Sequence, residues 1–154
     1  HHALNSWMNL KFGKQDFIID ETWYEVKCAL AGSSKITVSS LQQLDKINPG
    51  YLGIVFISSS SIESQSSITL NSLYESVLRI FESDADADLF SEVMMSIGYS
   101  KLPQYDEDAY ELIATKEYLV VDDFPCLRAS NLVGSGIVDA EYSISLDYIS
   151  KFEV

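Results

Sequence analysis

A glutamate and a lysine are separated by a single residue in the apolar segment 23–31, which reads Trp-Tyr-Glu-Val-Lys-Cys-Ala-Leu-Ala. Side chains of a β-strand alternate between its two faces, so Glu25 and Lys27 are expected to share one face. Asp16 lies in a second apolar segment, residues 15–20, whose last residue begins the short polar connection Asp20-Glu21-Thr22 between the two segments. We therefore expect a hairpin that brings Asp16 level with Glu25 or Lys27.

Two carboxylates and an ammonium in one place suit metal-dependent phosphodiester hydrolysis. Neighbouring carboxylates repel each other unless a cation lies between them, and oxygen ligands favour magnesium or manganese. The metal activates a water and shields the phosphate, while the ammonium orients the water or stabilises negative charge on phosphorus. The Glu-x-Lys pattern is short, however: it also arises by chance, and an exposed strand often carries it as a solvated ion pair.

Further landmarks extend the pattern over most of the chain. In order they are Trp7, Asp16-Phe17, Glu25-Val26-Lys27, Gln43-Leu44 and Phe124-Pro125. This order resembles the PD-(D/E)XK nuclease superfamily, in particular a little-characterised bacterial branch with Asp-Phe, Glu-Val-Lys and Gln-Leu motifs. The resemblance implies that Asp16, Glu25 and the backbone carbonyl of Val26 bind Mg²⁺ or Mn²⁺. It also implies that Lys27 is the catalytic lysine and that Gln43 supports it.

Two adjacent glutamines compete for that supporting position. A serine followed three residues later by a glutamine forms a capping box at a helix start, and both Ser39 with Gln42 and Ser40 with Gln43 fit it. Apolar residues at positions 41, 44 and 47 indicate that a helix begins after Ser40. Since both glutamines could serve as capping residues, the family resemblance alone favours Gln43.

The resemblance implies an α/β fold with a restriction-endonuclease-like core, in which helices flank a mixed central sheet. The serine-rich segment 58–67 is expected to be a flexible loop, and the last two β-rich segments to form a second hairpin or to extend the sheet. We expect one domain, with a core at about 7–60 and a helical and β-rich extension at about 68–154. Other patterned segments are strands at 35–39 and 51–58, helices at 70–81 and 89–97, and strands at 110–121 and 137–146.

Two features depart from the superfamily pattern. Gln15 stands where the family motif has a proline, a change that leaves the metal ligand Asp16 in place. The superfamily core also begins with a helix that carries a further acidic residue. Because little sequence precedes Trp7, we expect that helix to be absent from this chain.

Composition limits the class of protein. The chain has 154 residues, of which 47% are hydrophobic and 12% aromatic, enough to bury one core. No apolar stretch reaches the roughly 20 residues that span a bilayer, and no signal peptide is evident, so we expect a cytoplasmic protein without membrane contact. Cys28 and Cys126 are expected to be reduced core thiols rather than a disulfide.

The charge balance opposes unaided binding to nucleic acid. The chain carries 23 acidic and 10 basic residues, a net charge of −13, whereas basic contacts to phosphate supply most nucleic-acid affinity. We therefore expect DNA to be delivered with the help of an upstream segment or a partner protein. By resemblance, the setting is bacterial restriction or phage defence. Two alternatives stay open: a non-catalytic scaffold or adaptor that kept the fold, and a nuclease that acts on RNA.

Overall fold

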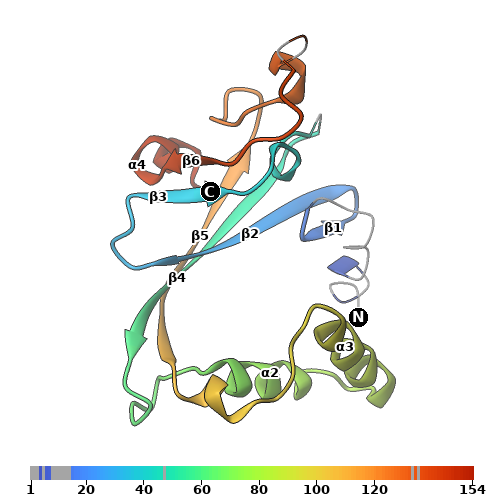
Figure 1. The fold of residues 1–154 in the computed structure, drawn as a ribbon, viewed down its shortest axis with the longest axis vertical. Coiled ribbons are helices and arrows are strands. Elements are labelled where there is room, and N and C mark those ends of the chain that lie inside the picture. The colour runs from blue at the N-terminus through green and yellow to red at the C-terminus, as the bar shows by residue number, and fades with distance from the viewer. Residues whose placement is uncertain (1–3, 5, 8–14, 47, 133, 135) are drawn as a thin grey trace.

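The computed structural model describes residues 4, 6–7, 15–46, 48–132, 134 and 136–154. Its centre is a four-stranded mixed sheet of order β1-β2-β4-β5. In this sheet β2 pairs antiparallel with β1 and parallel with β4, and β4 pairs antiparallel with β5 (Figure 1). The strands are β1 (Phe17–Ile19), β2 (Thr22–Leu30), β4 (Gly50–Ser60) and β5 (Ala109–Val120). A mixed α/β class with a mixed central sheet is thereby confirmed.

A separate two-stranded sheet lies over the upper end of the central sheet in Figure 1. It consists of β3 (Lys35–Val38) and β6 (Tyr142–Ser145), which pair antiparallel. The 3-10 turn η4 (Ala129–Leu132) precedes β6, and helix α4 (Leu146–Ile149) and the 3-10 turn η5 (Ser150–Phe152) follow it. The expected hairpin between the last two β-rich segments is therefore wrong. β5 extends the central sheet, whereas β6 pairs with a strand about 100 residues earlier in the chain.

One apolar core lies between the two sheets. The central sheet contributes large side chains from one of its faces, and the two-stranded sheet and α4 cover them. Because side chains alternate along a strand, the face of β2 that carries Trp23 also carries Glu25 and Lys27. The sheet thus directs an acid and a lysine toward the core rather than toward open solvent. The buried core residues are Trp23, Ile36, Val38, Leu44, Leu52, Ile54, Tyr118, Val120, Phe124, Ile144 and Ile149.

Helices α2 (Leu70–Leu78) and α3 (Asp84–Ser96) lie beyond the lower ends of β4 and β5 rather than over the central sheet (Figure 1). Both expected helices are present, the second starting five residues earlier than its apolar pattern indicated. Buried Asn71 of α2 donates to the Leu102 carbonyl and to Asp106, which fastens the helix to the 3-10 turn η3 (Pro103–Asp106). No helix in the described part of the chain is long and apolar enough to cross a membrane.

The helix expected after Ser40 is a single 3-10 turn, η2 (Leu41–Gln43). An α-helix that continued here would need the Lys46 amide to bond to the Gln42 carbonyl, four residues earlier. Instead, the Lys46 amide bonds to Leu44, and the Gln42 carbonyl accepts from the side chain of Gln15. A long-range side-chain contact therefore takes the place of the helical bond.

The serine-rich segment is attached to the central sheet. The hydroxyls of Ser60, Ser64 and Ser66 donate to Oε1 of Glu111 in β5 at 3.0, 2.7 and 2.6 Å. These hydrogen bonds hold the pKa of Glu111 below its usual range, and the bond from Ser66 has the largest effect. β4 also runs to Ser60, two residues beyond its expected end. The segment expected to be a flexible loop therefore has a defined anchor.

The two cysteines are free thiols, as expected. Their expected core location is wrong for Cys28, which is exposed because Val26 and Cys28 point to the face of β2 opposite Glu25. Cys126 is half-buried, and burial raises the pKa of its thiol.

Candidate active site

The β1–β2 hairpin sets the position of Asp16. Ile19 pairs with Thr22, which leaves Asp20 and Glu21 as a two-residue turn with φ angles of 48° and 68°. Positive φ at both central residues defines a type I′ turn, whose twist matches that of the paired strands. Since Phe17 pairs with Tyr24, Asp16 comes level with Glu25, one residue beyond. The expected hairpin is confirmed, with a connection of two residues instead of three.

Asp16 is bonded to the backbone of β2. Its Oδ2 accepts a hydrogen bond from the amide of Val26 at 2.7 Å. The N–H and C=O groups of one strand residue point to the same side of the strand. The carbonyl of Val26, expected as a metal ligand, therefore points toward the edge of β2 where Asp16 lies.

Lys27 joins Glu25 to Gln43. Its Nζ lies 2.9 Å from Glu25 Oε1 and donates to Gln43 Oε1, also at 2.9 Å. Glu25 is 1% exposed and the Lys27 side chain 15% exposed, so this is not a solvated surface pair. The structure also separates the two glutamines, because the side chain of Gln43 reaches the lysine whereas Gln42 contributes its backbone carbonyl.

Two further contacts fix the turn that carries Gln43. The amide of Ser39 donates to Gln43 Oε1 at 2.8 Å, which orients the side-chain oxygen toward Lys27. Gln15 Nε2 donates to the carbonyls of Gln42 and Gln43 at 2.6 and 3.3 Å. Sequence reasoning treated Gln15 as a neutral replacement for proline. The signal that could have revealed its role is a polar residue at the start of an apolar segment, directly before the acid.

The electrostatics of Glu25 are unusual for a carboxyl group. Its pKa is raised from 4.5 to about 7, chiefly because it is buried, and the hydrogen bond from Lys27 opposes that rise. The charge of Asp16 raises the pKa further, while the charge of Lys27 and the backbone amide of Asp16 lower it. Glu25 Oε2 is buried and has no hydrogen-bond partner among the described residues. Such an unpaired acceptor costs about 1–3 kcal/mol, a cost that a bound cation would relieve.

Comparison with known families bears on this cluster. The family described as "Putative PD-(D/E)XK family member, (DUF4420)" matches residues 1–147. The chain belongs to this family. The match confirms the resemblance seen in the sequence and includes every residue of the cluster. Comparisons with curated proteins and with solved structures gave no significant match.

The oxygen atoms of the cluster decide whether this PD-(D/E)XK chain could hold a metal ion there. The described residues contain no group of three or more His, Cys, Asp or Glu side chains that could hold a metal ion. Asp16 and Glu25 supply two carboxylates, and Val26 adds a carbonyl on the same edge. Mg²⁺ usually keeps several waters and binds one or two carboxylates, so this partial set of oxygen ligands fits it.

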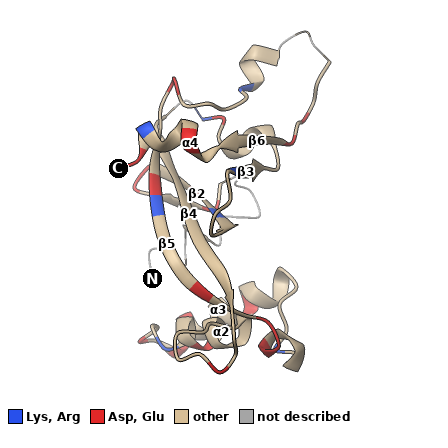
Figure 2. Cartoon of the chain, turned by 90° about the vertical axis from the view of Figure 1, so that its left-hand side faces the viewer, with Lys and Arg blue, Asp and Glu red and all other residues tan. Residues whose placement is uncertain are grey.

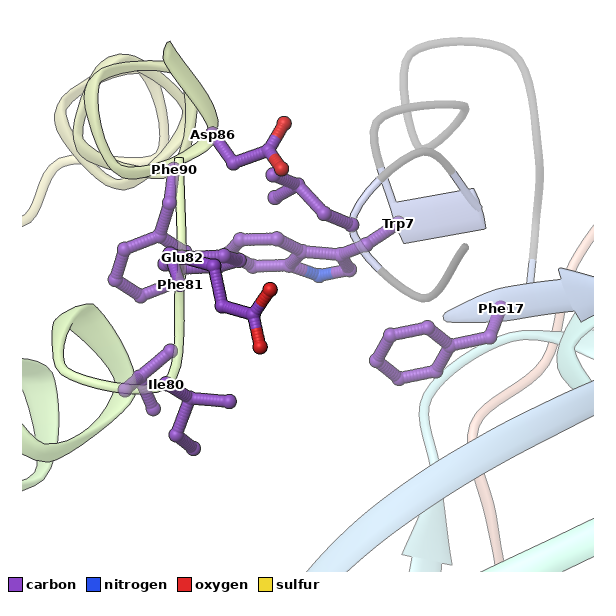
Figure 3. Close-up of a pocket in the computed structure, with 9 residues that line it drawn as sticks. Trp7, Phe17, Ile80, Phe81, Glu82, Asp86 and Phe90 are labelled. Carbon is purple, nitrogen blue, oxygen red and sulfur yellow. The ribbon is translucent and has the colours of Figure 1, made fainter. Parts of the chain in front are cut away.

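Two cavities of this PD-(D/E)XK chain are further candidate ligand sites, and one of them reaches the cluster at Lys27. One, of about 620 Å³, is lined by aromatic side chains between α2, α3 and the early chain, with Trp7 and Phe17 on one side and Phe90 opposite (Figure 3). The other, of about 610 Å³, lies on the open face of β2 beside Cys28 and is bordered by Lys27. Neither is lined by Asp16 or Glu25. The cluster is the stronger candidate for an active site, because a buried acid beside a lysine is chemically specific.

Proposed function

We propose that this protein is a divalent-metal-dependent nuclease that cleaves phosphodiester bonds of DNA. The observation that carries the proposal is the cluster itself, in which Lys27 lies between Glu25 and Gln43 and Asp16 is fixed on the adjoining backbone. Family membership supports this chemistry. A restriction-endonuclease-like core, a cytoplasmic setting and a role in bacterial restriction or phage defence belong to the same proposal and rest on the resemblance.

Asp16, Glu25 and the Val26 carbonyl would hold Mg²⁺ or Mn²⁺. The buried, unpaired Glu25 Oε2 supports this assignment, since a cation would satisfy it and offset the repulsion from Asp16. When bound, the metal acidifies a water and shields the charge of the phosphate. Two carboxylates alone would repel a phosphodiester, so the assignment also explains how the substrate can approach.

Lys27 supplies a positive charge of the protein's own. A lysine ammonium has three N–H donors, and Glu25 and Gln43 engage two of them. The third is available to a phosphate oxygen or to the attacking water. Because two acceptors fix the ammonium, its orientation is set before the substrate arrives, and preorganised charge of this kind stabilises a transition state most effectively.

The alternative is a non-catalytic adaptor that kept the fold. The net charge of −13 favours it, because such a chain repels nucleic acid. Figure 2 shows acidic positions distributed over both ends of the molecule and basic positions scattered singly among them. For the nuclease proposal, the same observation supports delivery of DNA by a partner protein or an upstream segment.

A plasmid assay tests the proposal. The purified protein would be incubated with supercoiled DNA in Mg²⁺ or Mn²⁺, beside Lys27→Ala and beside Lys35→Ala, which removes an exposed lysine of β3. We expect wild type and Lys35→Ala to nick or linearise DNA and Lys27→Ala to lose on the order of 100-fold or more in rate. Equal cleavage by Lys27→Ala would overturn the site assignment, and cleavage of RNA alone would overturn the substrate.

Metal binding separates the enzyme from the adaptor. Calorimetric titration with Mn²⁺ should show binding to wild type that is lost in Asp16→Asn and Glu25→Gln. Absence of both binding and cleavage in the wild type would favour the adaptor.

A further inference from the structure

A closed ring of contacts passes through the cluster. Asp16 Oδ2 accepts from the Val26 amide at 2.7 Å, and Val26 is the neighbour of Lys27. Lys27 Nζ donates to the side chain of Gln43 at 2.9 Å, and the backbone carbonyl of Gln43 accepts from Gln15 at 3.3 Å. Gln15 is in turn the neighbour of Asp16. Each member is joined to the next by a peptide bond or a hydrogen bond, so displacement of one member strains the others.

Gln15 closes this ring from the interior. It is 3% exposed, and its shorter bond, 2.6 Å, goes to the carbonyl of Gln42. Burying an amide is costly unless it is hydrogen-bonded, so an apolar side chain would suit this position better if packing were its whole purpose. The bonds instead fasten η2 to the segment just before β1, where Gln15 is followed by Asp16.

We propose that Gln15 is a positioning residue of the active site. By anchoring η2 it holds Gln43, and through Gln43 it holds the ammonium of Lys27 beside the two carboxylates. The catalytic consequence rests on the proposed nuclease function, whereas the positioning of Lys27 rests on the contacts alone.

The other half of the Gln15 amide supports this assignment. Gln15 Oε1 is buried without a hydrogen-bond partner, and so is Glu25 Oε2, while Tyr142 Oη completes the set of such atoms in the described residues. Buried polar atoms are nearly always paired, and exceptions in native structures call for an explanation. One exception belongs to the residue that bonds η2 and the other to the residue that bonds Lys27, so both adjoin the contacts that pass through Gln43. An unpaired Gln15 Oε1 is therefore not expected of a residue that serves packing alone.

Two matched variants test the anchor. Gln15→Met keeps the length of the side chain and removes its polar atoms. Gln42→Met makes the same change at the neighbouring position. It serves as the control because Gln42 contacts Gln15 through its backbone carbonyl, which the variant retains. The readout is the initial rate at which an amine-acylating reagent modifies Lys27 in the folded protein, divided by the rate at exposed Lys35, measured by peptide mass spectrometry.

We expect the Lys27/Lys35 ratio to rise several-fold in Gln15→Met and to stay at the wild-type value in Gln42→Met. An unchanged ratio in folded Gln15→Met, or an equal rise in both variants, would overturn the proposal. Should Gln15→Met fail to fold, Gln15→Asn replaces it, since it keeps a buried amide one methylene too short to span to η2. A rise in that ratio supports the anchor, and an unchanged ratio overturns it.

Plasmid cleavage provides the second readout. Loss of a residue that orients a catalytic group typically costs 10–100-fold. We expect a decrease of that order in kcat for Gln15→Met with little change in KM, and no change for Gln42→Met. If the wild type cleaves nothing, the proposed function fails, while the acylation ratio still decides whether Gln15 positions Lys27.

Discussion

The indole ring of Trp23 occupies the place that a side chain on Gly50 would take. The two residues pair across the parallel β2–β4 ladder, and a Cβ built on Gly50 would overlap the indole ring. The ring is 3% exposed, and its Nε1 donates to the carbonyl of Asn48 at 2.8 Å. A glycine is therefore required here for close approach of the ring to the backbone.

We expect Gly50→Ala to displace the ring and to lower the free energy of unfolding by about 1–3 kcal/mol, the usual cost of overpacking a core. Gly53→Ala is the matched control on the same strand, because the nearest atoms to its Cβ would lie 3.9 Å away. Urea unfolding of both variants measures the difference. Equal losses would show that Trp23 relaxes without cost.

The raised pKa of Glu25 predicts an unusual dependence of stability on pH. The pKa of Glu25 is about 7 in the folded protein, compared with an ordinary value of 4.5. Its contribution to folding stability is therefore fully present below pH 4.5 and is lost as the pH rises through 7. We expect the stability of Glu25→Gln relative to wild type to increase by about 3 kcal/mol between pH 4.5 and 8 without metal. Urea unfolding in EDTA across this range tests it. Parallel curves for the two proteins would contradict it.

The two thiols should react at different rates. Cys28 is exposed on the open face of β2, whereas Cys126 is half-buried with a raised pKa, and the thiolate is the reactive form. With a disulfide reagent at pH 8, we expect one fast and one slow phase, the fast phase disappearing in Cys28→Ser. Two fast phases in the native protein would indicate that Cys126 is accessible.

The anchor of the serine-rich segment should control its susceptibility to proteolysis. Glu111→Gln removes the charge that Ser60, Ser64 and Ser66 share, while Glu117→Gln removes an exposed acid elsewhere on β5. We expect a glutamate-specific protease to cut after Glu63 faster in the first variant and at the wild-type rate in the second. Because the folded pKa of Glu111 is lowered, wild-type protection should weaken as pH falls through that pKa. Equal rates in all three proteins at pH 8 would show that the segment is held by other contacts.

Sequence reasoning found the parts of the site that follow local periodicity. The two-residue period of a strand placed Glu25 and Lys27 on one face, and polar residues between two strands predicted the hairpin that locates Asp16. It failed where distant segments compete for the same groups. The helix after Ser40 was lost because Gln15, 27 residues from Gln42, takes a helical carbonyl. The partner of β6 was missed for the same reason, since no local pattern reports pairing with β3.

The tightness of the turn at Asp20 and Glu21 has a consequence for how this chain can change. Surface turns usually tolerate inserted residues. Here the two-residue connection sets the alignment that seats Asp16 on the Val26 amide. One extra residue would shift one strand of the hairpin against the other and separate the acid from its partner while leaving the buried core nearly whole. A chain lengthened at this point could remain folded and lose its chemistry, so length variation among functional relatives should occur elsewhere.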